Sequence, residues 1–169
     1  RLIECLKTWE WELYKRRKRL RLKNERPVII ASNCVGAIAY KDLKLPFYSP
    51  TINLFINMDD FIRFVENLEW YLKQPILPAY EEGISFPVGM VGDIKIYFMH
   101  YDSFEDAVRA WERRIQRVDL NNLFIIGCER ERCVYETLKQ FDRLPYKNKV
   151  VFTQKDYPEF SSAFHICHS

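Results

Sequence analysis

The segment Val28–Tyr40, VIIASNCVGAIAY, constrains the fold more than any other part of the sequence. Its run of β-branched residues ends abruptly in Ser32, Asn33 and Cys34, and small residues follow from Gly36 onward. β-Branched residues favour a strand, and the small-residue run that follows is compatible with a closely packed helix. We therefore predict a buried strand, a tight polar turn and the start of a helix. Open α/β sheets bind ligands at the carboxyl ends of their strands, so this turn is the first candidate site.

The same order of apolar strand and then helix or long loop recurs along the chain. Strands are predicted at residues 28–31, 51–56, 93–99, 122–126 and 149–153. The segment 73–92 contains three prolines and three glycines, and we expect it to be mostly loop. This alternation predicts an α/β fold with a mostly parallel sheet of about five strands and helices on both faces. We assign residues 27–169 to this single domain and residues 1–26 to a basic amphipathic helix that precedes it.

Composition indicates a folded protein in a reducing compartment. The chain has 169 residues, of which 48% are hydrophobic, and no apolar run is long enough to span a bilayer. Its five cysteines are scattered and form no CxxC pair, which argues against a disulfide framework and a zinc ribbon. We expect a cytoplasmic protein without a signal peptide. Because the chain begins with Arg1, we also expect its natural start to lie upstream.

Positive charge is concentrated in the first 26 residues. They hold ten Lys or Arg against four Asp or Glu, whereas the remainder holds 16 against 19. Apolar residues recur near helical spacing between Leu2 and Leu20 and are interrupted by a basic run. Two interpretations remain open: residues 1–24 lie on an anionic membrane surface, or they form a packing helix with a solvated basic face. The first places the protein at the inner face of a membrane.

Several chemistry-bearing residues follow the predicted strands. If the sheet is parallel, one rim gathers the residues Ser32, Asn33, Cys34, Asn57, Asp59, His100, Tyr101, Asp102, Cys128, Glu129 and Arg130. A thiol and an imidazole on one rim are the parts of a nucleophile and its base, so Cys34 and His100 are the candidate catalytic pair. A helix that begins after Cys34 would lower the pKa of its thiol. The alternative is a buried, inert cysteine in a small-residue turn.

Basic and metal-ligating side chains give weaker indications. Arg114 and Arg117 either bind a phosphate or carboxylate, or only complement the dipole of the helix predicted from Ser103. The terminal run His165–His168 is too tightly spaced for a closed metal site, so we predict no metal. Neither a Walker A motif nor a GxGxxG motif is present, and the cofactor, if there is one, is unknown from the sequence.

Several short motifs together resemble those of one bacterial family. They are Ser32-Asn33-Cys34-Val35-Gly36-Ala37 followed by Tyr40, Phe47-Tyr48-Ser49-Pro50-Thr51, the pair His100-Tyr101, Trp111 with Arg114 and Arg117, and the run Phe141–Val150. On these motifs the chain resembles exopolysaccharide biosynthesis proteins that share a domain of unknown function. That family has an Asn-Asn-Cys-Trp-Gly-Gly type of turn, and here Ser32, Val35 and Ala37 replace the first Asn, the Trp and the second Gly. The resemblance implies a role in capsule or exopolysaccharide synthesis.

Two functions follow from these observations. The first is a transferase that modifies a polysaccharide precursor, for example by acyl-type transfer, with Cys34 as nucleophile and His100 as base. The second is a non-catalytic module that binds a sugar or sugar-nucleotide at membrane-associated assembly machinery. The substrate-binding candidates in both are Ser32, Asn33, Gly36, Tyr40, Tyr101, Asp102, Arg114 and Arg117. We expect no nucleic-acid binding, because the globular part is net acidic.

Overall fold

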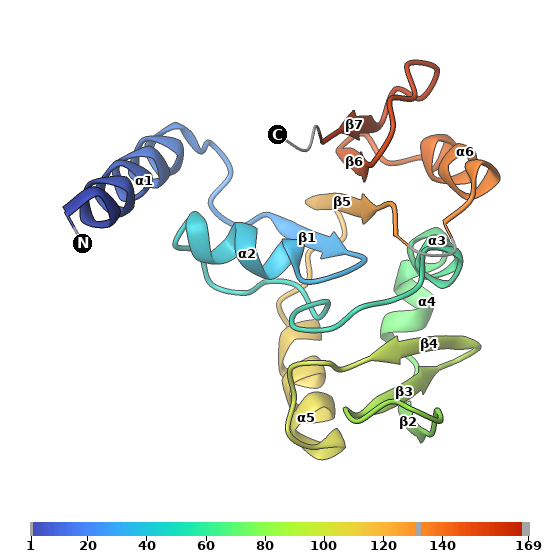
Figure 1. Cartoon of the computed structure of the whole chain (residues 1–169). Coiled ribbons are helices and arrows are strands. Elements are labelled where there is room, and N and C mark those ends of the chain that lie inside the picture. The colour runs from blue at the N-terminus through green and yellow to red at the C-terminus, as the bar shows by residue number, and fades with distance from the viewer. Residues whose placement is uncertain (1, 131–132, 167–169) are drawn as a thin grey trace.

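The computed structural model describes residues 2–130 and 133–166, with side chains from Trp9 onward. The helices are α1 (Leu2–Arg21), α2 (Val35–Asp42), α3 (Met58–Glu66), α4 (Leu68–Leu72), α5 (Phe104–Ile115) and α6 (Tyr135–Arg143). The strands are β1 (Val28–Ala31), β2 (Ile76–Ala79), β3 (Val88–Val91), β4 (Ile94–Tyr97), β5 (Leu123–Cys128), β6 (Lys149–Thr153) and β7 (Ala163–His165). Figure 1 shows the strands in two separate sheets, with α1 extending away from both.

The first sheet has four strands in the order β1-β5-β6-β7, and every neighbouring pair is parallel. Alternate residues of β1 point to opposite faces, as the pleat requires. Val28 and Ile30 enter the main core, which includes α3 and α6. Ile29 enters a smaller core with Ala37 and Tyr40 of α2. Helices therefore cover both faces of the sheet at β1, in agreement with the α/β prediction.

The second sheet corrects the predicted architecture. Strands β2, β3 and β4 form an antiparallel sheet of their own, so the single sheet of about five mostly parallel strands is wrong. The segment predicted as loop, 73–92, contains two of these strands. Gly92 stands in the tight turn between β3 and β4 with φ +59°, a conformation that glycine adopts without steric cost. The predicted strand 51–56 is also wrong, since only Phe55 makes a β-bridge, to Tyr97.

Local signals predicted the helices correctly. Ser103 caps α5 by accepting a hydrogen bond from the Asp106 backbone N–H at 3.1 Å. Trp111 of α5 is 1% exposed and packs on Phe64 of α3, with ring centroids 6.1 Å apart. The helical segment that follows Asn57 is interrupted at residue 67, so it forms the two helices α3 and α4. These helices form the layer between the two sheets (Figure 1).

Candidate functional site

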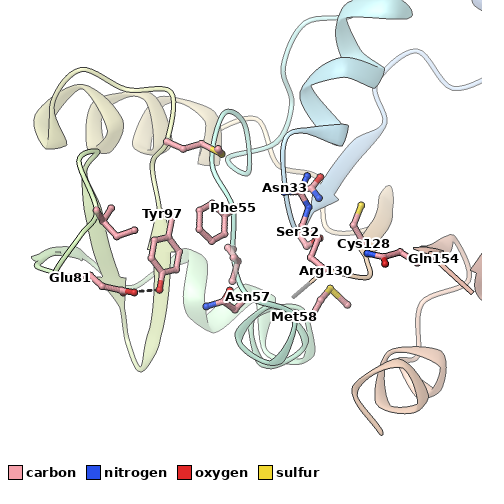
Figure 2. A pocket seen from close by; sticks show the side chains of 13 residues that line it. Ser32, Asn33, Phe55, Asn57, Met58, Glu81, Tyr97, Cys128, Arg130 and Gln154 are labelled. Atoms are coloured by element: carbon pink, nitrogen blue, oxygen red, sulfur yellow. Dashed lines mark hydrogen bonds between the residues drawn. The ribbon is translucent and has the colours of Figure 1, made fainter. Parts of the chain in front are cut away.

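A cavity of about 600 Å³ lies where the two sheets approach each other. It falls within the size range of small-molecule sites. We call it the junction cavity, and its lining combines apolar, amide and charged side chains: Ser32, Asn33, Phe55, Ile56, Asn57, Met58, Glu81, Ile84, Tyr97, Met99, Cys128, Arg130 and Gln154. Figure 2 shows these side chains converging from the carboxyl ends of the parallel strands and from the edge of the antiparallel sheet.

Parallel pairing builds one wall of the junction cavity. Ala31 of β1 pairs with Ile126 of β5, and the Ser32 N–H continues the ladder by donating to the Ile126 carbonyl at 2.9 Å. The two strands therefore end side by side, as the parallel-sheet argument predicted. Ser32 and Asn33, which follow β1, meet Cys128, the last residue of β5, and Arg130 on the same wall. This adjacency was predictable because both strands are apolar runs that end in polar turns.

The segment that precedes α3 forms the floor and joins the two sheets. The Ile56 N–H donates to the Ser32 carbonyl at 2.9 Å, which ties the segment to the end of β1. Phe55 and Tyr97 exchange two backbone hydrogen bonds of 2.9 Å, which tie it to β4. Their rings stack with centroids 4.2 Å apart and planes 1° from parallel. The floor thus presents aromatic surface held rigidly by backbone pairing on both sides.

The opposite wall carries a hydrogen-bonded acid. The Tyr97 hydroxyl and the Lys95 ammonium both donate to Oε2 of Glu81, each at 2.8 Å. Burial and the hydrogen bond to Glu81 raise the pKa of Tyr97, so its hydroxyl stays protonated and acts as a donor at neutral pH. The side chain of Asn57 lies near enough to oppose this rise through its own hydrogen bond. Glu81 is therefore held in place as an acceptor at the edge of the cavity.

A guanidinium and a thiol lie on the wall formed by β1 and β5. Burial raises the pKa of the Cys128 thiol, while hydrogen bonds from Asn33 and Ser32 and the charge of Arg130 oppose that rise. Arg130 is exposed and makes no ion pair with the other described residues. The junction cavity thus places a positive charge on one wall and the Glu81 carboxylate on the other (Figure 2).

Comparison with known proteins identifies the family. Residues 6–168 match the family described as a domain of unknown function (DUF1919). The chain belongs to this family. It is also 43% identical over 146 residues to an uncharacterized protein of Haemophilus influenzae (strain KW20 / Rd), an alignment that covers 86% of this chain and 70% of that protein. The unknown-function domain implied by the sequence motifs is thereby confirmed.

The DUF1919 domain places the predicted catalytic pair outside the lining of the junction cavity. Cys34 precedes α2, and its thiol lies 3.9 Å from the Leu54 carbonyl and 4.0 Å from Met99 Sδ. Burial raises the pKa of this thiol, and the charges of Arg130 and Lys41 oppose the rise. This is opposite to the lowered pKa expected from a helix N-terminus. A neutral, half-buried thiol that contacts Met99 is poorly suited to nucleophilic attack.

His100 follows β4 and not a strand of the parallel sheet. The prediction that all these strand ends share one rim is therefore wrong for His100, Tyr101 and Asp102. The His100 side chain is exposed, and no hydrogen bond joins it to Cys34 in the described part of the chain. Asp102 lines a separate cavity of about 300 Å³ beside β2 and β3. Its role as a ligand contact stays a prediction, as does the role of His100 as a base.

Four predicted binding residues have intramolecular partners instead. The Tyr40 hydroxyl, 0% exposed, donates to the Pro27 carbonyl at 2.7 Å and accepts from the Ile29 N–H at 2.9 Å. Arg114 is buried and donates to the Tyr101 hydroxyl, which donates to the Ile52 carbonyl at 3.0 Å. Arg117 donates to the Phe47 carbonyl at 3.2 Å.

These contacts serve the loop at residues 47–52. The guanidinium of Arg114 also lies over the ring of Phe47, 5.4 Å from its centroid. The hydroxyl of Thr51 accepts from the Ala31 N–H at 3.0 Å, which anchors the loop to β1. We call Tyr40, Phe47, Ser49, Thr51, Tyr101 and Arg114 the loop cluster. None of its members lines the junction cavity, so its contribution to the site is to position the segment that becomes the floor.

Gly36 has a packing role in the DUF1919 domain. A Cβ atom at this position would lie 2.9 Å from the Cβ of Ala31, so only glycine lets α2 pack this closely on β1. The glycine thereby fixes the start of α2 next to Ser32 and Asn33. Asn33 contributes to the same geometry, because its Oδ1 accepts from the Val35 N–H at 3.0 Å.

Sequence reasoning did not select Phe55, Tyr97 and Glu81 as site residues. They lie in or next to segments whose pairing was wrongly predicted, so their convergence on the β1 rim was not visible. The alternation of β4 placed Tyr97 on the face opposite Ile94 and Ile96, and this was the available signal that its ring serves another surface than theirs. Cys128 and Arg130 were expected at the rim but were not chosen as site residues.

Metal and membrane candidates are limited within the described ranges. Among residues 2–130 and 133–166, no group of three or more His, Cys, Asp or Glu side chains is arranged to hold a metal ion. Cys167 and His168 of the terminal cluster lie outside the described residues. Over the same ranges, no helix combines the length and apolar character needed to cross a bilayer.

Proposed function

We propose that the junction cavity binds a carbohydrate that carries a negatively charged group, such as a sugar acid or sugar phosphate, as part of polysaccharide assembly. The observation that carries this proposal is the combination of side chains in one cavity of about 600 Å³. A pyranose ring presents C–H groups on its faces and hydroxyls around its edge. The first suit the aromatic and thioether surface of the floor, and the second suit amides and carboxylates, which can donate or accept.

Each wall has a specific task in this proposal. Asn57 and Gln154 contribute amide groups that can bind sugar hydroxyls. The Glu81 carboxylate, already oriented by Tyr97 and Lys95, accepts from a hydroxyl at the opposite edge. Arg130 supplies a positive charge and a forked donor for a carboxylate or phosphate. The family resemblance to exopolysaccharide proteins supports a sugar ligand, because one of its motifs is the turn that forms this wall.

Binding is better supported than group transfer. The transferase hypothesis requires the Cys34 thiolate in contact with the substrate, but the thiol lies outside the lining and burial raises its pKa. The lining holds a different thiol, Cys128, whose pKa is raised by burial as well. A cavity whose thiol stays neutral is suited to holding a ligand without attacking it. The cytoplasmic location stays a prediction.

Titration of the chain with glucose, glucuronate, glucose 1-phosphate and UDP-glucose, followed by calorimetry, tests the proposal. We expect glucuronate or one of the phosphorylated sugars to bind and glucose to bind at least about tenfold more weakly, because the ion pair with Arg130 is missing. Arg130→Gln should remove this difference. Arg143→Gln, on the exposed side of α6, is the matched control and should leave it unchanged. Equal binding of all four probes by both variants, or no binding at all, would contradict the proposal.

A further inference from the structure

Helix α1 carries an apolar stripe whose two ends, Trp9 and Leu20, do not pack on the rest of the described chain. Among its described side chains, Trp9, Leu13 and Leu20 fall on one side at helical spacing. Trp9 is 64% exposed and Leu20 is 80% exposed. A helix that packs on a domain buries its apolar side. Leu13 is half-buried, but the packing interpretation offered by the sequence does not account for Trp9 and Leu20, which the described residues leave exposed.

A different side of α1 holds the helix on the body of the protein. Lys15 lies 3.7 Å from Asp42 at the end of α2, and Lys44 lies 3.9 Å from Glu12. With 100° per residue, position 15 is turned about 140° and position 12 about 80° from the centre of the Trp9–Leu20 stripe. These ion pairs orient the helix so that its apolar stripe faces outward, and Figure 1 shows α1 standing clear of both sheets.

Basic side chains border the stripe. Arg16 and Arg17 lie on its two edges by helical spacing, and both are exposed. Residues 9–26 hold eight Lys or Arg against three Asp or Glu. An apolar stripe with tryptophan, bordered by long cationic side chains, matches the interface between the hydrocarbon and the phosphate groups of a bilayer. The aliphatic parts of the arginines can lie along the stripe while their charges reach the phosphates.

The charge distribution favours a membrane over a second copy of the chain packed in parallel. Two α1 helices packed through their stripes in parallel would bring the basic runs Lys15–Arg19 together, and like charges repel. An anionic lipid surface neutralises the same run. From this geometry we propose that α1 lies on the surface of an anionic bilayer, with Trp9, Leu13 and Leu20 inserted at the level of the headgroups. This proposal is independent of what the junction cavity binds.

Vesicle co-sedimentation of the full chain tests the proposal. We expect binding to vesicles of phosphatidylcholine mixed with phosphatidylglycerol at low salt, weaker binding at high salt, and little binding to phosphatidylcholine alone. Two tryptophans provide a matched pair of variants. Trp9→Ser should weaken the partitioning at least about fivefold, because it removes an inserted ring. Trp11→Ser should change it less than about twofold, because Trp11 lies on another side of the helix.

The structure makes Trp11 a suitable control for Trp9. Trp11 is 50% exposed, comparable to Trp9, and stacks on Tyr14 with ring centroids 5.3 Å apart. Equal losses in the two variants, or equal binding to both kinds of vesicle, would overturn the proposal. Sedimentation equilibrium tests the alternative that a second copy of the chain covers the stripe. A dimer that Leu20→Glu dissociates, without any vesicle binding by the native chain, would show that a second copy covers the stripe.

Discussion

The loop cluster and the junction cavity are both rich in polar side chains, and both adjoin the turn after β1. In the loop cluster, Arg114, Tyr101 and Tyr40 bond to one another or to backbone carbonyls, and little of their polar surface is left for a ligand. In the junction cavity, the amides, Glu81 and Arg130 line an open volume of about 600 Å³. Polar residues near a strand end therefore divide into those that build the site and those that face it.

The comparison explains why motif residues did not predict the cavity lining well. Buried polar groups need hydrogen-bond partners inside the protein. The Tyr40 and Arg114 motifs are of this kind. Asn57 was expected at the rim because it follows an apolar run, whereas Gln154 carries no comparable signal and a single sequence gives little reason to select it.

Arg114→Ala should strongly destabilise the fold. The substitution removes a buried guanidinium that bonds to Tyr101 and covers the ring of Phe47. We expect the free energy of unfolding to fall by about 2–4 kcal/mol, and the Tm by roughly 5–15 °C, as measured by urea and thermal denaturation. Arg113→Ala, an exposed neighbour on the same helix, should cost less than about 0.5 kcal/mol. Equal, small effects would show that the loop cluster is not a structural unit.

Tyr40→Phe should have the next largest effect on stability. It removes a hydroxyl that satisfies the Pro27 carbonyl and the Ile29 N–H, both at the start of β1. Two backbone groups would lose their buried partner, for which we expect a cost of about 1–3 kcal/mol in urea denaturation. Tyr80→Phe is the control, since Tyr80 is 85% exposed. Burial raises the pKa of both Tyr40 and Tyr71 to about 12, so spectrophotometric titration of the variant should show one late-titrating tyrosine fewer than the native chain.

Asn57→Ala should separate stability from binding in the junction cavity. The Asn57 side chain lines the cavity and is only partly buried, so the free energy of unfolding should change by less than about 1 kcal/mol. Affinity for the bound sugar probe should fall about tenfold, which calorimetry would measure, because an amide contact is lost. A large loss of stability with unchanged affinity would show that Asn57 supports the fold and does not bind the ligand. The distinction between residues that build the site and residues that face it would then be wrong for this position.

The sequence predicted those parts of the fold that depend on local signals, and it missed those that depend on pairing between distant segments. The β1–α2 unit was predicted correctly because its apolar run, polar turn and small residues act locally. The antiparallel sheet was missed because Pro78 and the glycines indicated loop, although proline is tolerated in an edge strand such as β2. The Gly92–Asp93 pair between β3 and β4 was an available hairpin signal. Strand β7 has only three residues and depends on non-local pairing with β6.

The segment 51–56 shows how a local pattern can mislead. Its sequence, TINLFI, has the composition of a strand, yet Asn53 adopts φ +61° and interrupts any extended run. Thr51 and Ile56 instead bond to different parts of β1 and the turn after it. Composition indicated that the segment is buried, but only the tertiary structure shows that it links two sheets and forms the cavity floor.

The reactivity of the thiols tests the hypothesis that Cys34 is a catalytic nucleophile, and here we expect only a small change. Burial raises the pKa of Cys34 and of Cys128, and it raises that of Cys133 to about 11. At pH 8 each folded thiol should therefore hold its proton and react with iodoacetamide more slowly than the same cysteine in urea, with Cys133 slowest. Peptide mapping by mass spectrometry would give the three rates separately. The unfolded chain supplies the reference for each site.

The sign of the effect follows from proton linkage. A raised pKa means that the folded state binds the proton more tightly than the unfolded state does. The thiols should therefore reduce the stability of the fold as pH rises above the ordinary thiol pKa and toward the folded values. An activated nucleophile would behave in the opposite way. If Cys34 alone reacted faster in the folded chain than in urea, its pKa would be lowered, and the turn after β1 would again be a candidate for covalent catalysis.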